Sequence, residues 1–261
     1  MEEEPLSRTF WGTVENFVPH LEELRRRLIV CAVFFAAASI LSYFFTRQIL
    51  DFLTAPLQHF HIVNLYFQKP FEAFVIHLKA AAFSGLVLSL PVFFTQGWLF
   101  AAPGLYEKEK KIFPPLILIS VVLFLTGIFF AYQFVIPWGL RFLLSYETDS
   151  LKPMLTSGPY FSFITATLFA FGLLFDFPLV VVALAALGIV QMDTLARLRR
   201  VIIVVIFIAA ALLTPSPDPL SQLLLAAPLW VLFEISLFVG RFFERKAARG
   251  AAIDNTNDEV V

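Results

Sequence analysis

The residues of this chain that could do chemistry are acidic side chains set beside basic ones on two short segments. Glu22 and Glu23 stand directly before three arginines at 25–27, and Glu109 lies between Lys108 and two further lysines. A carboxylate and a guanidinium form planar, charge-assisted hydrogen bonds. Each segment therefore admits two interpretations: its carboxylates bind a cationic partner, or its charges remain on a solvated surface and pair among themselves.

The first of these segments has the pattern of an amphipathic helix at the membrane surface. Its leucines recur at helical spacing on one face, while the charged residues crowd the other; these are Leu21, Leu24 and Leu28. The same spacing predicts two internal ion pairs four residues apart, Glu22–Arg26 and Glu23–Arg27. In the second segment Pro103 and Gly104 end the preceding helix, which is typical of a loop.

Three other polar residues stand in or beside strongly apolar stretches. Asp176 lies deep inside one such stretch, next to Pro178. An ionisable group there costs free energy unless it faces protein or water, so Asp176 is a candidate functional residue, with a role in helix packing as the alternative. Asp218 and Gln222 follow a proline-rich turn, and Asp218 could cap the next helix.

Other kinds of chemistry lack the residues they need. Cys31 is the only cysteine and cannot form an intramolecular disulfide. Metal-ligand clusters are missing, and no histidine lies deep in an apolar stretch to serve a serine nucleophile. We therefore expect a protein that is not an enzyme and that binds no cofactor, metal or nucleic acid.

The elements that must position these residues are transmembrane helices. The chain of 261 residues is 59% apolar and 15% charged, with 32 phenylalanines, whereas soluble domains are about 45–50% apolar and about 25% charged. A helix needs about 20 residues to cross a hydrocarbon core of about 30 Å. The predicted fold class is all-α, a polytopic integral membrane protein with six transmembrane helices at residues 28–45, 72–100, 113–136, 160–187, 201–213 and 220–239.

We expect these helices to form a single transmembrane domain over residues 1–261, with no soluble appendage. The fifth range is short for a span. We still predict a span there, because arginines flank one of its ends and prolines flank the other. Residues 247–261 are small and polar, so a disordered tail is predicted there.

The basic residues predict the orientation of the helices. Fourteen of the 19 Lys and Arg residues lie on the side of the two termini, four lie on the other side, and Lys79 lies within the second range. Because loops rich in Lys and Arg stay in the cytoplasm, both termini are predicted to be cytoplasmic.

Taken together, these segments resemble the TatC family, the receptor component of the twin-arginine protein translocase. The resemblance rests on five motifs, which follow one another in the family's order from about Val18 to Glu234. They are H-L-x-E-L-R at 20–25 followed by Arg27 and Leu28, P-F-E-A-F at 70–74 with Lys79, F-x-x-P-G-L-Y-x-x-E at 100–109, F-[DE]-x-P at 175–178 and T-P-x-P-D-x-x-S-Q at 214–222.

The resemblance implies a function and a set of partners. TatC proteins bind the twin-arginine signal peptides of folded cargo proteins at the cytoplasmic face of the bacterial inner membrane. They act with single-span subunits of the TatA and TatB types, self-associate in a receptor complex within membrane lipid, and use the proton-motive force without a cofactor. The alternative from the residues alone is an ion-coupled secondary transporter of a small solute, although the internal repeats typical of such folds are absent.

The resemblance also implies roles for individual residues. Glu23 and Glu109 would form the signal-peptide site, with Arg25 and Phe100 nearby. Asp176 stands where the family usually has Glu and would contact a partner helix. Asp218 and Gln222 match polar positions near the outer face. Neighbouring side chains of an extended peptide point in opposite directions, so two separated carboxylates suit two adjacent arginines.

Overall fold

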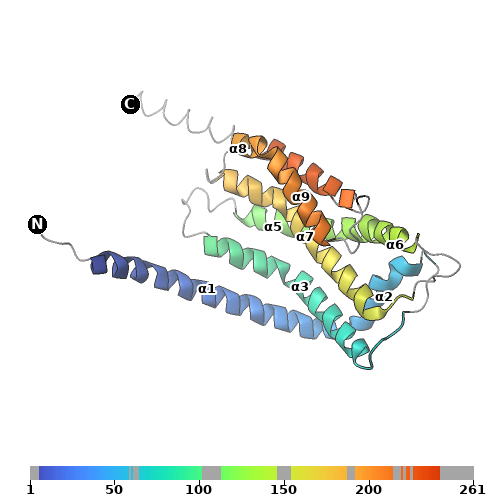
Figure 1. Cartoon of the computed structure of the whole chain (residues 1–261). Coiled ribbons are helices and arrows are strands. Elements are labelled where there is room, and N and C mark those ends of the chain that lie inside the picture. Colours follow the sequence, from blue (N-terminus) through green and yellow to red (C-terminus); the bar gives the residue numbers. More distant parts are fainter. Residues whose placement is uncertain are drawn as a thin grey trace, which may run out of the picture. The chain divides into compact units, whose positions relative to one another are not determined.

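The structure is a computed structural model that describes residues 6–58, 60, 65–101, 113–145, 154–186, 192–213, 219, 222–223 and 226–241, with side chains from Leu21 onward. Within these ranges every regular element is a helix, and one isolated parallel bridge joins Tyr66 to Thr156. The elements in chain order are α1 (Leu6–Tyr43), α2 (Thr46–Gln58), α3 (Glu72–Ala101), α5 (Phe113–Phe130), the π-helix η2 (Ala131–Val135), α6 (Ile136–Leu144), α7 (Ser157–Ala186), α8 (Met192–Arg197) and α9 (Arg199–Leu213), followed by helical residues 226–241 (Figure 1).

Several of these helices are long and apolar enough to cross a bilayer. Three qualify alone, namely Glu72–Phe100, Pro115–Leu144 and Ser157–Val182, and a fourth is possible if Leu21–Tyr43 and Thr46–Gln58, bent by 81°, form one broken span. In the region of the predicted fifth and sixth spans, the described helices are the 15-residue α9 and residues 226–241. The exact span limits stay predictions, and the tail predicted at 247–261 lies outside the described residues.

The chain divides into two compact units, Met1–Ile49 with Leu78–Leu118 and Leu50–His77 with Ile119–Val261. In the first unit, α1 is one continuous helix of 38 residues, about 57 Å long at the usual rise. The charged segment expected at the membrane surface is therefore part of the same helix as the first predicted span. Glu23 and Arg27 are held on this rigid element.

Within the first unit, α1 approaches α3 closely at a glycine. A Cβ atom built on Gly85 would lie 2.6 Å from both the Cα and the backbone nitrogen of Ser39. Helices in membranes often approach at small residues, because their backbones can then come into contact. Contacts pair residue 39 with 85 and residue 27 with 96, so α1 and α3 run antiparallel.

In the second unit, α5 and α7 interlock through aromatic rings and glycines. The ring of Phe124 covers Gly172, where a Cβ would lie 2.6 Å from the ring, and Phe124 is fully buried. A Cβ on Gly127 would lie 2.9 Å from the side chain of Phe175. Further along, α8 and α9 pack with 226–241 around a core of Val181, Phe233 and Leu237.

The second half of α2 is held in the second unit by two tyrosine hydroxyl groups. Pro56 has no N–H, so the Phe52 carbonyl four residues earlier loses its usual helical donor. The Tyr132 hydroxyl donates to that carbonyl at 2.7 Å, and the two rings stack with centroids 4.3 Å apart. The Tyr160 hydroxyl donates to the next carbonyl, that of Leu53, at 2.9 Å. Tyr132 belongs to η2, the kind of helical irregularity that often marks a functional feature.

Two glycines of α3 provide a matched test of the α1–α3 contact. Gly85→Ala should lower the free energy of unfolding by about 1–3 kcal/mol, because the new methyl group must displace the α1 backbone. Gly97→Ala lies on the same helix with nothing within 4 Å of the added atom and should be neutral or stabilising. Thermal unfolding in detergent measures both, and equal stability of the two variants would contradict the close contact.

The Tyr132 hydroxyl should matter only because Pro56 leaves the Phe52 carbonyl without a helical donor. Tyr132→Phe is expected to cost about 0.5–1.5 kcal/mol of stability, the usual net contribution of one hydrogen bond, because this bond lies at an exposed position. Pro56→Ala restores the backbone N–H, so the same tyrosine change should cost much less in that background. A double-mutant cycle of unfolding free energies measures this coupling. Strictly additive effects would show that the proline and the tyrosine act independently.

Candidate functional site

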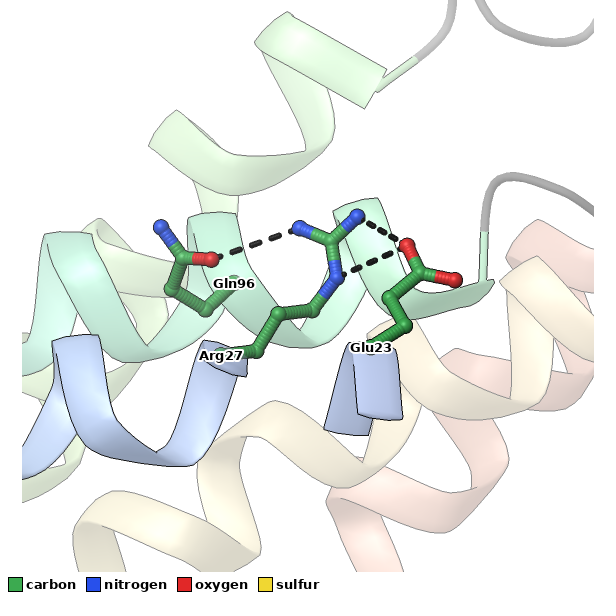
Figure 2. Close-up of polar contacts among 3 residues, drawn as sticks. All are labelled: Glu23, Arg27 and Gln96. Atoms are coloured by element: carbon green, nitrogen blue, oxygen red, sulfur yellow. Dashed lines mark hydrogen bonds and ion pairs between the residues drawn. The ribbon is translucent and has the colours of Figure 1, made fainter. Parts of the chain in front are cut away.

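Glu23 lies in an ion pair at the centre of the candidate site. The Nε atom of Arg27 donates to Glu23 Oε1 at 3.0 Å, and Arg27 Nη2 contacts the same oxygen. The Nη1 atom of Arg27 donates to Oε1 of Gln96 on α3 at 3.3 Å (Figure 2). The predicted pair Glu23–Arg27 is thus confirmed, whereas no ion pair joins Glu22 to Arg26 in the described part of the chain.

The antiparallel arrangement of α1 and α3 brings Phe100 to the level of Glu23. Arg27 on α1 bonds to Gln96 on α3. Glu23 lies one turn before Arg27 in α1, and Phe100 lies one turn after Gln96 in α3. Because the helices run in opposite directions, both steps lead toward the same end of the pair. A carboxylate and an aromatic ring therefore stand at one level in the first unit, on two different helices.

Arg25 lies on another side of α1. It is exposed and borders a shallow apolar hollow of about 430 Å³, which is lined by Leu21, Leu24, Arg25, Leu28, Ile29 and Ala32. The leucines predicted to share one face of the helix do line this hollow together. Glu109 lies outside the described residues, so its proximity to Glu23 stays a prediction.

Asp176 is buried in α7, with 6% of its surface exposed. Both carboxylate oxygens are buried and have no hydrogen-bond partner among the described residues. A carboxylate in this position is costly unless it is neutralised or meets a polar group. Asp176 bonds to none of the described residues of the neighbouring helices, and its functional role stays a prediction.

Gln222 contacts the backbone of α9. Its Nε2 donates to the carbonyl oxygen of Phe207 at 2.8 Å, which ties the segment after the proline-rich turn to the preceding helix. Asp218, the predicted cap, lies outside the described residues. Within the described ranges no group of three or more His, Cys, Asp or Glu residues could hold a metal ion.

Comparisons with known proteins decide the family. A sequence model described as "Sec-independent protein translocase protein (TatC)" matches residues 19–228. The chain belongs to the TatC family. It is 39% identical to a Sec-independent protein translocase protein TatC of Carboxydothermus hydrogenoformans over 88% of this chain and 95% of that one. Identity to the protein of the same name from Magnetococcus marinus is 38%, over 91% of this chain and 88% of that one.

Solved structures of TatC agree with this assignment. Two crystal structures of the twin-arginine translocase receptor TatC, one of them in the detergent DDM, match with TM-scores of 0.77 and 0.76 at 36% identity. They cover 85% and 86% of this chain and 99% of theirs. The predicted all-α TatC fold with six transmembrane helices is confirmed, as is its function in the translocase. The solute-transporter alternative has no support among these matches.

One residue of this TatC protein that sequence reasoning missed is Glu72, at the start of α3. Its Oε2 accepts hydrogen bonds from the backbone N–H groups of Gln68 at 2.6 Å and Lys69 at 3.2 Å. Its Oε1 accepts from the N–H of Gly158 at 2.5 Å, in the first turn of α7. One carboxylate thus caps the entry to α3 and the beginning of α7. An acidic residue in the first turn after Pro70 was the available signal.

The polar contacts around Glu72 continue into the loop that precedes it. The N–H of Tyr66 donates to the Leu155 carbonyl at 3.1 Å, and the N–H of Ser157 donates to the Tyr66 carbonyl at 3.0 Å. The loop before α3 and the start of α7 therefore form one hydrogen-bonded layer within the second unit. This layer anchors one end of α7, the helix that carries Asp176.

Proposed function

We propose that this TatC protein binds the twin-arginine signal peptides of folded proteins and forms the core of their translocase, which the proton-motive force drives. The observation that carries the proposal is the Glu23–Arg27 pair, in which a guanidinium already lies on the carboxylate expected to receive one. The receptor function named for the matching crystal structures supports it.

The free energies of the two interactions favour replacement of Arg27 by an arginine of the peptide. The Glu23 side chain is 30% exposed and Arg27 20%, so their pair resembles the helical surface pairs that contribute about 0.3–0.5 kcal/mol. A hydrogen bond between charged groups in a shielded site contributes about 1.5–3 kcal/mol. Gln96 already bonds to Arg27 and could retain it after the exchange.

Glu109 is the proposed acceptor of the second guanidinium. An arginine pair in an extended peptide projects in opposite directions, so it requires acceptors on two separate segments. Glu23 lies on α1, while Glu109 follows α3 along the chain. We assign Phe100, at the level of Glu23, to apolar contact with the peptide, and Arg25 to the border of the same site.

The proposed partners are TatA-type and TatB-type single-span subunits and further copies of TatC. A polar residue on a partner's helix would satisfy the buried oxygens of Asp176. Asp218 and Gln222 are proposed to form a polar site at the outer face. Both termini are proposed to be cytoplasmic, because most basic residues lie on their side of the membrane. The membrane is proposed to be a bacterial inner membrane, as the family implies.

The exchange predicts different effects for the two members of the ion pair. Glu23→Ala or Glu109→Ala should weaken twin-arginine peptide binding roughly tenfold to a hundredfold, since a tenfold change requires about 1.4 kcal/mol. Glu→Lys at either position should abolish binding by repulsion. Arg27→Gln should change the affinity less than tenfold, because Arg27 only competes for Glu23 through a weak pair. Titration of labelled peptide measures all of these affinities.

A twin-lysine peptide is the matched control for this titration. It lacks the planar donors and should be nearly insensitive to either Ala substitution. Binding of the twin-arginine peptide should also decrease with added salt, since the site is open to water. Unchanged affinity in both Lys variants would assign the carboxylates a purely structural role.

Asp176 can be tested separately from peptide binding. Asp176→Ala should weaken crosslinking of a partner helix to α7 and impair transport, because it removes the polar group proposed to attract that helix. Peptide affinity should not change. Thr167→Ala, equally buried on the same helix, is the control and should leave crosslinking intact. Normal crosslinking and transport in the Asp176 variant would contradict the proposed contact.

A further inference from the structure

Three arginines from two helical segments, the continuous α8–α9 path and residues 226–241, line one hollow in the second unit. Arg197 is the last residue of α8, Arg199 is the first of α9, and Arg241 ends the described helical residues 226–241. Together with Asp193 and Ala196 they line a shallow hollow of about 450 Å³. The hollow belongs to the second unit, whereas the residues of the proposed peptide site, Glu109 included, belong to the first.

The hollow has an excess of positive charge. Arg199 pairs with Glu234 at 3.1 Å, and Arg241 contacts Asp193 at 3.8 Å, with the Asp193 side chain 85% exposed. Within the described ranges Arg197 has no carboxylate partner and is exposed. Three guanidinium groups thus face two carboxylates, one of which is mostly in solvent. Such a site can accept a further anion.

An apolar face of α9 begins one helical turn after Arg197. Hydrogen bonds from the Leu198 N–H to the Thr194 carbonyl and from the Ile202 N–H to the Leu198 carbonyl continue the helical path from α8 into α9. Arg197 therefore lies one turn before Val201, on the same face. Four side chains of that face, each more than half exposed, are Val201, Val204, Val205 and Ile208. The opposite face, with Ile202 and Ile206, packs on the protein core.

We propose that this hollow binds the headgroup of an anionic phospholipid, whose acyl chain lies along the exposed face of α9. A guanidinium forms paired hydrogen bonds with phosphate, and basic pockets between membrane helices suit anionic headgroups. Control of topology requires only positive charge on one side of the membrane. It requires neither convergence of the α8–α9 path with residues 226–241 nor an apolar face aligned with Arg197. The proposal is independent of the receptor function.

The test uses the purified full-length protein in a neutral detergent. Its melting temperature is followed during titration with phosphatidylglycerol, with phosphatidylcholine and with inorganic phosphate. Phosphatidylglycerol should stabilise the protein far more than the other two. Arg197→Gln should weaken its apparent affinity about fivefold, which corresponds to about 1 kcal/mol for one basic residue. Arg241→Gln should have a similar effect.

Arg200→Gln is the matched control, because Arg200 has the same charge at the same end of α9 but does not line the hollow. Its effect should be less than twofold. Arg197→Lys keeps the charge without the planar donors; it should weaken binding partially, and it replaces the Gln variant if that fails to fold. Native mass spectrometry should find less retained phosphatidylglycerol in the Arg197 variants than in the control.

Three outcomes would overturn the proposal. Equal stabilisation by phosphatidylcholine would remove the anionic headgroup from the interaction. Full stabilisation by inorganic phosphate would identify a site for a free anion rather than for a lipid. Equal losses in the Arg197, Arg241 and Arg200 variants would indicate attraction to the surface as a whole.

Discussion

The hydrocarbon core of a bilayer contains no water to bond with backbone N–H and C=O groups, and much of this structure follows from that constraint. Proline within a helix removes one internal donor, and α2, α3 and α7 each contain a proline. In α2, which lies outside the predicted spans, the same loss is made good by a side chain, because the Phe52 carbonyl that Pro56 leaves without its donor accepts from the Tyr132 hydroxyl. A bent element is thereby attached to the helices beside it by side-chain donors.

The ends of the long helices carry caps for a related reason. The first N–H groups of a helix have no internal acceptor. Glu72 accepts from the N–H group of Gly158 at the beginning of α7 and from two N–H groups just before α3. The bridge between Tyr66 and Thr156 adds to this layer. These contacts fix the beginning of α7, the helix that carries Asp176.

Local patterns predicted much of this structure, and the failures have physical causes. Apolar length and proline-flanked ranges predicted the helical class, and i,i+4 spacing predicted the Glu23–Arg27 pair. The role of Gln96 depends on which residue of α3 lies opposite Arg27, and no periodicity within either helix contains that information. The Glu72 contact joins residues 86 apart in the chain. Glu22–Arg26 has the same spacing as its neighbour, but both residues are exposed, and they form no ion pair in the described part of the chain.

In the proposed function, Glu23 and Asp176 are two carboxylates that await a partner in opposite environments. Glu23 is partly exposed and paired, so a competing guanidinium can replace Arg27 at little cost, while Gln96 remains as an alternative acceptor for the displaced side chain. Asp176 is buried, and no described residue satisfies its oxygens. Burial without a partner raises the free energy of the isolated subunit, and that energy is recovered when a polar group arrives. In the proposed function, a water-exposed site suits the exchange of peptides, whereas the buried one suits assembly of helices within the membrane.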